Sequence, residues 1–143
     1  MENKNRRYWR IIDVNFNRAR EGLRVIEDTG RFVMNNEKLV KKIRQLRQQL
    51  GKLSSADYSG LLHFRDVESD WGREFSENGT YQNIAEIVRA NFRRTEEALR
   101  VLEEYSRLLF AARRKQFKHL RFALYQLEKD FFGSFEKSWT KKN

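Results

Sequence analysis

The sequence has no cysteine and no proline, and only seven glycines and two histidines among its 143 residues. The lack of cysteine excludes a disulfide scaffold, a cysteine-bound zinc and a thiol nucleophile. No apolar run approaches the roughly 20 residues that cross a bilayer, and the residues after Met1 lack the apolar core of a signal peptide. Because proline and glycine interrupt helix interiors, their scarcity favours long helices. We therefore expect a compact cytoplasmic domain with no membrane span.

The chain repeats itself at a constant offset of 76 residues. Residues 14–34 read VNFNRAREGLRVIEDTGRFVM, residues 90–110 read ANFRRTEEALRVLEEYSRLLF, and nine of the 21 aligned positions are identical. Similarity resumes at an offset of 74, where the matched pairs are Leu46 with Leu120, Arg47 with Arg121, and Leu50 with Leu124. The repeated unit is therefore predicted to be a helical hairpin that occurs twice.

Apolar residues recur in alternating steps of four and three along both copies of the repeat. The first stripe is Ile12, Phe16, Ala19, Leu23, Ile26, Gly30 and Val33, and the second is Val88, Phe92, Thr95, Leu99, Leu102, Ser106 and Leu109. Such a stripe is typical of a helix packed nearly parallel or antiparallel to its neighbours.

Helix boundaries follow from the residues that flank these stripes. Asn35 and Asn36 are predicted to end the first helix, with Asn36 as the cap of the second. Further helices are expected at about 37–53, 83–112 and 114–135, with a weak point at Gly133. The sequence thus predicts an all-α single domain, 1–143. It consists of a duplicated helical hairpin that forms a pseudo-twofold four-helix bundle, with repeats at 11–53 and 81–135.

Between the repeats lies a segment of different composition, residues 54–80, which we expect to be a long central loop. It contains Gly60, Gly72 and Gly79 and is rich in turn-forming residues. A structureless connection of this length is uncommon in a compact domain and is often functional. The carboxylates of Asp66, Glu68 and Asp70 could ligate magnesium; an acidic, solvated turn is the alternative.

Charge is distributed unevenly along the chain, whose net charge is +10. Residues 11–34 and 81–112 are each neutral, whereas residues 35–53 carry +5 and residues 113–143 carry +6; the central segment carries −4. The duplicated helices are therefore internally balanced, and their partner helices are basic.

Arginines and glutamates follow one flank of each apolar stripe. Glu27 lies three residues from Arg24 and four from Arg31, so it can pair with both, and Arg100, Glu103 and Arg107 repeat the spacing. Two interpretations stay open: an ion-paired helix face, or a polar interior that binds phosphate through bidentate arginines.

Asn15 with Arg18, and Asn91 with Arg94, lie on the other flank of the two stripes. Either these side chains are solvated on the helix surface, or they hydrogen-bond a small ligand between the helices. The chain has no GxxxxGK[ST] or GxGxxG loop, and no GxSxG, HExxH or HRD motif. A nucleotide would therefore have to be held by side-chain arginines and acid-bound magnesium.

These residues resemble a known family. IIDVNFNRAREGLRVIEDTGRFVM, RDVESDWG, VRANFRRTEEALRVLEEYSRLL and LRFALYQLEK together look like the helical domain at the N-terminus of certain bacterial thiamine-phosphate synthases. That domain has been assigned as a hydroxymethylpyrimidine phosphate kinase, and the resemblance spans residues 6 to about 130. The sequence departs from the family's pattern at 79–83, where a Glu and an Arg are expected, and at Trp71, where a small aliphatic residue is expected.

The resemblance implies ATP-dependent phosphorylation of hydroxymethylpyrimidine phosphate to its diphosphate in thiamine biosynthesis. ATP and Mg²⁺ would be the cofactors and a pyrimidine phosphate the substrate. On physical grounds, we expect the catalytic residues to be Arg18, Glu21, Asp66, Arg94 and Glu97. We expect substrate and phosphate to bind at Asn15, Arg24, Arg65, Asn91 and Arg100, and magnesium at Asp66 and Asp70.

Two other classes of function stay open. The basic helices 35–53 and 113–143 suit a nucleic-acid-binding bundle, although no DNA- or RNA-binding motif is present. A non-catalytic assembly module is the other, in which Phe131, Phe132, Phe135 and Trp139 form a homodimer face or the bundle's own end. The sequence ends at Asn143 without a synthase domain, which suits a stand-alone enzyme, a piece of a longer protein or a repurposed relative. A thiamine-phosphate synthase is a further expected partner.

Overall fold

The computed structural model describes residues 2–75 and 79–140 of the chain. Five α-helices occur in this part: α1 (Glu2–Asp28), α2 (Glu37–Ser55), α3 (Tyr58–Phe64), α4 (Ile84–Leu109) and α5 (Arg114–Thr140). They are joined by a π-helical turn, η1 (Thr29–Val33), and two 3₁₀ turns, η2 (Trp71–Glu74) and η3 (Ala111–Arg113). The described residues contain no strand, which confirms the all-α prediction.

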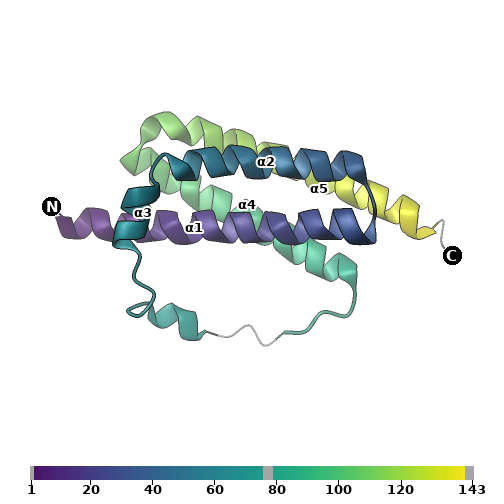
Figure 1. Ribbon diagram of the computed structural model, residues 1–143, viewed down its shortest axis with the longest axis horizontal. Coiled ribbons are helices and arrows are strands. Elements are labelled where there is room, and N and C mark those ends of the chain that lie inside the picture. The colour runs from purple at the N-terminus through teal and green to yellow at the C-terminus, as the bar shows by residue number, and fades with distance from the viewer. Residues whose placement is uncertain (1, 76–78, 141–143) are drawn as a thin grey trace.

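The four long helices lie side by side (Figure 1). α1 and α4 run in opposite directions and cross each other, and α2 and α5 return along α1 and α4 respectively. α1 packs most extensively against α4, and α2 also contacts α5. None of the described helices has both the length and the hydropathy that a membrane span requires.

Asparagine caps fix the starts of two long helices. The side chain of Asn36 accepts a hydrogen bond from the backbone N–H of Leu39 at 3.1 Å, as predicted for the cap of α2. Asn83 caps α4 in the same way, through the N–H of Glu86 at 2.9 Å. The helix ends differ from the predicted ones. α4 stops at Leu109 before η3, and α5 continues through Gly133 to Thr140.

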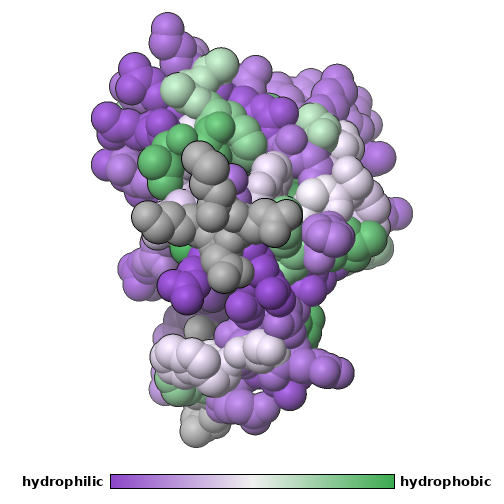
Figure 2. Space-filling model, turned by 90° about the vertical axis from the view of Figure 1, so that its left-hand side faces the viewer, coloured by the Kyte–Doolittle hydropathy of each residue, from purple (hydrophilic) through white to green (hydrophobic). Residues whose placement is uncertain are grey.

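The prediction that residues 54–80 form a structureless loop is wrong in part, because α3 forms within them. α3 packs against α1, where the ring of Trp9 stacks on Phe64 with centroids 6.5 Å apart and lies close to Gly60. Arg113 of η3 pairs with Asp57, which immediately precedes α3. Beyond α3 the chain loops away from the helices through η2 (Figure 1) and forms a lobe below them in the end-on view of Figure 2.

The predicted apolar stripes form the core, with two exceptions at their ends. Both stripes are buried except Val33, which is exposed, and Leu109, which is partly buried. Val33 is displaced because η1 widens the last turn: the N–H of Met34 bonds the carbonyl of Thr29 at 3.1 Å, five residues back.

α1 and α4 approach each other closely at Gly22. A β-carbon on Gly22 would collide with Oγ1 of Thr95 and lie 3.1 Å from the carbonyl oxygen of Asn91. Thr95 Oγ1 itself donates to that carbonyl at 2.8 Å. The absence of a side chain at Gly22 therefore allows the two duplicated helices to cross in contact.

Candidate functional site

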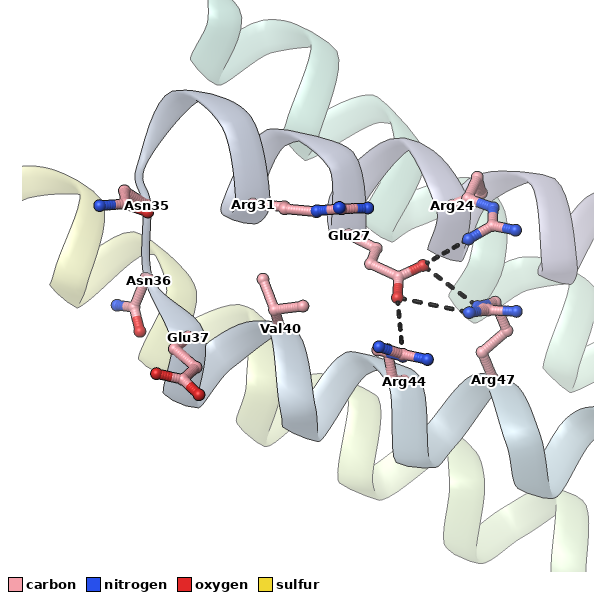
Figure 3. A pocket seen from close by; sticks show the side chains of 9 residues that line it. All are labelled: Arg24, Glu27, Arg31, Asn35, Asn36, Glu37, Val40, Arg44 and Arg47. Atoms are coloured by element: carbon pink, nitrogen blue, oxygen red, sulfur yellow. Dashed lines mark hydrogen bonds and ion pairs between the residues drawn. The ribbon is translucent and has the colours of Figure 1, made fainter.

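An arginine-lined pocket of about 440 Å³ lies between the end of α1, η1 and the first half of α2. We call it the first pocket; it is lined by Arg24, Glu27, Arg31, Asn35, Asn36, Glu37, Val40, Arg44 and Arg47. Figure 3 shows the guanidinium groups of α1 and α2 gathered around the carboxylate of Glu27. Its volume is within the range of small-molecule sites.

Glu27 organises this pocket. Its side chain is only 5% exposed and accepts hydrogen bonds from Nε of Arg47 at 3.1 Å and from Nη1 of Arg24 at 3.1 Å. Arg44 approaches the other carboxylate oxygen at 3.7 Å. The network therefore joins α1 to α2 and holds arginines of both helices at the pocket wall.

The pocket has more donors than Glu27 can satisfy. A carboxylate offers about four acceptor positions, and each guanidinium carries five N–H groups. Arg31 also faces the pocket, and no described residue forms an ion pair with it; its guanidinium lies 4.7 Å from the ring centroid of Phe32. Four arginines against Glu27 and Glu37 leave a net charge of +2. The surplus charge and donors suit an oxyanion.

The backbone at the pocket mouth is irregular. η1 replaces the last α-helical turn, and Asn35 adopts the left-handed conformation with φ 52°. π-helical turns often occur at functional sites. Asn36 then caps α2, whose amino-terminal end, favourable for negative charge, opens into the pocket.

A second pocket, of about 510 Å³, lies between the end of α4 and the first half of α5. It is lined by Arg100, Glu103, Arg107, Arg114, Lys115, Lys118, Arg121 and Phe122. Glu103 accepts from Nε of Arg121 at 3.0 Å, and Arg100 lies 3.6 Å from it. Hydrogen bonds to Tyr125 and Glu103 raise the pKa of Arg121. Six cations against Glu103 give this pocket a net charge of +5.

The two pockets occupy positions that the repeat makes equivalent. Arg24, Glu27 and Arg31 match Arg100, Glu103 and Arg107 at the offset of 76, and Arg44 and Arg47 match Lys118 and Arg121 at the offset of 74. Glu27 and Glu103 are both buried between helices. Each forms the predicted ion pair with the arginine three residues before it, Arg24 or Arg100, and also pairs with an arginine of the partner helix.

The sequence patterns identified only part of these networks. The predicted pair between Glu27 and Arg24 is confirmed, whereas among the described residues Glu27 pairs with Arg44 and Arg47 and not with Arg31. The sequence offered one sign that Arg47 belongs to this network, because Arg47 recurs in the repeat as Arg121. It offered no such sign for Arg44, because the equivalent residue is Lys118 and the pairing of Arg44 depends on how α2 packs.

The predicted asparagines are buried between helices and not solvated. Asn15 and Asn91 are 3% and 7% exposed. Their amide nitrogens donate to backbone carbonyls of their own helices, Asn15 to Ile11 at 2.9 Å and Asn91 to Ile87 at 2.8 Å. Surface solvation is thus wrong for both, and neither residue lines the two pockets.

The predicted catalytic residues on the helices lie outside the pockets. Arg18 and Glu21 on α1, and Arg94 and Glu97 on α4, are all exposed. Arg24 and Arg100, predicted to bind phosphate, do line the pockets, one in each. The structure thus separates two sets of residues that the sequence analysis had joined in one site.

Arg65 anchors the start of the central lobe to α1. Its Nε and Nη2 donate to the two carboxylate oxygens of the buried Asp13 at 2.8 and 2.6 Å, and these bonds raise the pKa of Arg65. Arg10 donates to the backbone carbonyl of Asp66, the residue that follows Arg65, at 3.0 Å. The guanidinium of Arg65 is therefore occupied by an internal contact with Asp13.

The carboxylates predicted to bind magnesium stabilise their own loop. Asp66 accepts from the backbone N–H of Ser69 at 3.1 Å, and this bond, aided by Arg10 and Arg6, holds the pKa of Asp66 below its ordinary value. Asp70 accepts from the N–H of Gly72 at 3.0 Å. Within residues 2–75 and 79–140, no three acidic or histidine side chains form a group that could hold a metal ion. The magnesium role of Asp66 and Asp70 therefore stays a prediction.

A pair of acids lies between α4 and α5. Burial, together with Glu128, raises the pKa of Glu96 to about 8, and Oε2 of Glu96 is buried without a described hydrogen-bond partner. The sequence patterns gave no sign of this pair, because its members are far apart in sequence.

The fold and the pockets define an all-helical protein in which two buried glutamates each organise a cluster of arginines. The chain matches the ThiD2 family over residues 10–130 and belongs to that family. It is 42% identical over 127 residues to a thiamine-phosphate synthase of Nostoc punctiforme and 40% identical to that of Synechocystis sp.. Each match covers 87% of this chain but only 35% and 36% of these relatives, about a third of their length. No solved structure matches the chain.

Proposed function

We propose that the chain acts in thiamine biosynthesis as a kinase that phosphorylates hydroxymethylpyrimidine phosphate to its diphosphate with ATP. Membership of the ThiD2 family supports a role in the pathway, since the relatives are thiamine-phosphate synthases. The observation that carries the proposal is the first pocket. There, arginines from α1 and α2 surround the buried Glu27 and have N–H donors that its carboxylate does not use.

The proposed transfer suits a site without a general base. A non-bridging oxygen of the monophosphate attacks the γ-phosphorus of ATP, a new P–O bond forms, and the bond from that phosphorus to the β–γ bridging oxygen breaks to release ADP. A phosphate monoester has its second pKa near 6, so the attacking oxygen is already deprotonated at neutral pH. The protein then has to position two phosphates and neutralise their charge.

In this mechanism Arg31 and Arg44 bind phosphate oxygens, and Arg24 and Arg47 are oriented for the same purpose by Glu27. Buried carboxylates that hold arginines in place reduce the ordering cost of binding. Magnesium is proposed to enter with ATP as its complex, where it would neutralise phosphate charge, and no step is assigned to a protein-held metal. The roles predicted for Arg18, Glu21, Asp66, Arg94 and Glu97 remain predictions.

The proposal extends to the architecture. We infer that the two repeats are related by a pseudo-twofold axis through the crossing of α1 and α4, and that the four long helices form one bundle. The equivalent glutamate–arginine contacts in the two pockets support this inference.

The test is an assay of ADP release with ATP, magnesium and hydroxymethylpyrimidine phosphate. Arg31→Ala and Arg44→Ala should each lower kcat/KM by about 10- to 100-fold, the value of a charge-assisted hydrogen bond. Arg20→Ala is the matched control, since Arg20 is an exposed arginine of α1 outside the pocket. No ADP above background with the unmodified protein would overturn the function. An active enzyme unaffected by both pocket variants would overturn the placement alone.

A further inference from the structure

The second pocket has an aromatic rim, formed by Phe122. Tyr125 follows Phe122 on α5 with its ring centroid 6.0 Å away, and the two side chains are 53% (Phe122) and 42% (Tyr125) exposed. The guanidinium of Arg121 lies 5.1 Å from the centroid of Phe122, and Nζ of Lys118 lies 5.9 Å from it. An accessible ring beside cations is a surface on which a planar heterocycle can stack while its charged groups reach the cations.

The repeat shows that the helical framework does not require this rim. At the offset of 74, Phe122 corresponds to Gln48, and Tyr125 corresponds to Gly51. Arg114, which lines the second pocket, corresponds to Val40, which lines the first. The two pockets keep the same buried glutamate and partner arginine but differ in aromatic surface and in charge.

The two pockets are too far apart to serve one phosphoryl transfer. Glu27 lies five residues beyond Gly22 on α1, and Glu103 lies eight residues beyond Thr95 on α4. Because α1 and α4 run in opposite directions (Figure 1), a rise of 1.5 Å per residue places the two glutamates roughly 20 Å apart along the helix pair. A donor in one pocket would not reach an acceptor in the other.

We propose that the second pocket is a separate binding site for a polyphosphate ester of an aromatic heterocycle, such as a nucleoside diphosphate or triphosphate. The heterocycle stacks on Phe122, and the polyphosphate lies among Arg107, Arg114, Lys115 and Lys118. Glu103 holds Arg121 beneath the ring of Phe122. The position of the aromatic rim relative to the cations of the pocket wall is therefore fixed. Binding here is no step of the proposed kinase reaction, so the site stands independently of it.

The rim also argues for an aromatic ligand over inorganic phosphate. Phosphate alone would be satisfied by the cations and would gain nothing from Phe122. Base–aromatic stacking, in contrast, contributes roughly 5- to 100-fold in affinity per ring. The contribution of Phe122 therefore separates the two kinds of ligand.

The experiment is titration calorimetry of the full chain with ADP in EDTA, with inorganic tripolyphosphate and with a single-stranded oligonucleotide. Variants are made in an Arg44→Ala background, which weakens the first pocket. Phe122→Ala is the test, Gln48→Ala is the matched control at the equivalent position of the first repeat, and Arg114→Ala tests the cationic wall. Both Phe122 and Gln48 are exposed, so neither substitution disturbs the core.

The proposal expects Phe122→Ala to weaken ADP binding at least fivefold and to change tripolyphosphate binding less than twofold. Arg114→Ala should weaken both ligands, and Gln48→Ala neither. Equal effects of Phe122→Ala and Gln48→Ala on ADP would overturn the proposal, as would an absence of ADP binding. Loss of oligonucleotide binding in Phe122→Ala with ADP binding unchanged would overturn it in favour of a nucleic-acid surface.

Discussion

Glu27 of α1 accepts a hydrogen bond from Nε of Arg47 of α2 at 3.1 Å, and the equivalent Glu103 of α4 accepts from Nε of Arg121 of α5 at 3.0 Å. In each half of the chain, the duplicated helix supplies a buried carboxylate and the basic partner helix supplies the guanidinium. Part of the positive charge of α2 and α5 therefore completes internal ion pairs.

The unequal burial of the arginines around Glu27 predicts unequal effects on stability. Arg47 is only 25% exposed, whereas Arg24 is 58% exposed. Arg47→Ala should lower the free energy of unfolding by about 2–3 kcal/mol, because it leaves a buried carboxylate poorly compensated. Arg24→Ala should lower it by less than about 1 kcal/mol, as for an exposed pair.

Urea unfolding followed by circular dichroism measures both changes. The double variant Glu27→Gln with Arg47→Ala is the control, since it removes the charge that Arg47 compensates. Its destabilisation should be smaller than the sum of the two single effects. Equal losses from Arg47→Ala and Arg24→Ala would contradict the proposed role of burial.

The helix crossing yields a prediction about Gly22. Gly22→Ala places a β-carbon against Oγ1 of Thr95, so it should lower the free energy of unfolding by about 1–3 kcal/mol, as overpacking does. Thr95→Ala in the same chain should restore most of the loss. Gly133→Ala is the matched control: nothing lies within 4 Å of its β-carbon position, and alanine in a helix interior should raise stability by about 0.5–1 kcal/mol. Thermal unfolding of these three variants and the unmodified protein compares them directly.

Periodicity and repetition predicted the elements that depend on local sequence. The apolar stripes, the Asn36 cap and the all-α class were visible because each rests on residue spacing within one helix. α3 was missed because its seven residues include Gly60 and are flanked by polar residues, and because contacts such as that between Trp9 and Phe64 support it. Short helices of this kind depend on tertiary packing more than on propensity.

The candidate site was harder to predict, because its residues meet across helices. Spacing along α1 placed Arg24 and Glu27 on one flank but could not show that Glu27 faces α2. The same limit applies to Arg65, whose partner Asp13 is 52 residues away. The repeat showed which side chains recur. The packing of the helices determines that Asn15 is buried and that Glu27 binds Arg47.

The acid pair of Glu96 and Glu128 predicts a pH dependence of stability. In the folded chain the pKa of Glu96 is raised to about 8, above its unfolded value, so the folded state holds a proton that the unfolded state releases. The destabilising contribution of this group is absent below the unfolded pKa, grows as pH rises above it, and is complete above about pH 8. Stability should therefore fall between about pH 5 and pH 8.

Urea unfolding at pH 5, 6, 7 and 8 tests this dependence. Glu96→Gln stays neutral at every pH and should flatten the profile. Glu97→Gln removes only the weakest of the charges that raise the pKa of Glu96, so it should flatten the profile much less. If Glu96→Gln and the unmodified protein lost stability in parallel between pH 5 and 8, another group would be responsible.

Arg65 provides the sharpest contrast between a ligand-binding and an anchoring role. Its two bonds to Asp13, at 2.8 and 2.6 Å, fasten the chain that leads from α3 into the central lobe. Arg65→Ala should therefore speed amide hydrogen exchange across Asp66–Glu74, because this segment loses its tie to α1. Arg65→Lys keeps the charge but cannot make the bidentate contact, so it should restore only part of the protection.

Hydrogen exchange measured by mass spectrometry tests both variants, and the KM of the proposed kinase reaction is measured for the same two proteins. A rise in KM with unchanged exchange would show that Arg65 binds substrate, as the sequence predicted, and faster exchange with unchanged KM would show that it anchors the lobe.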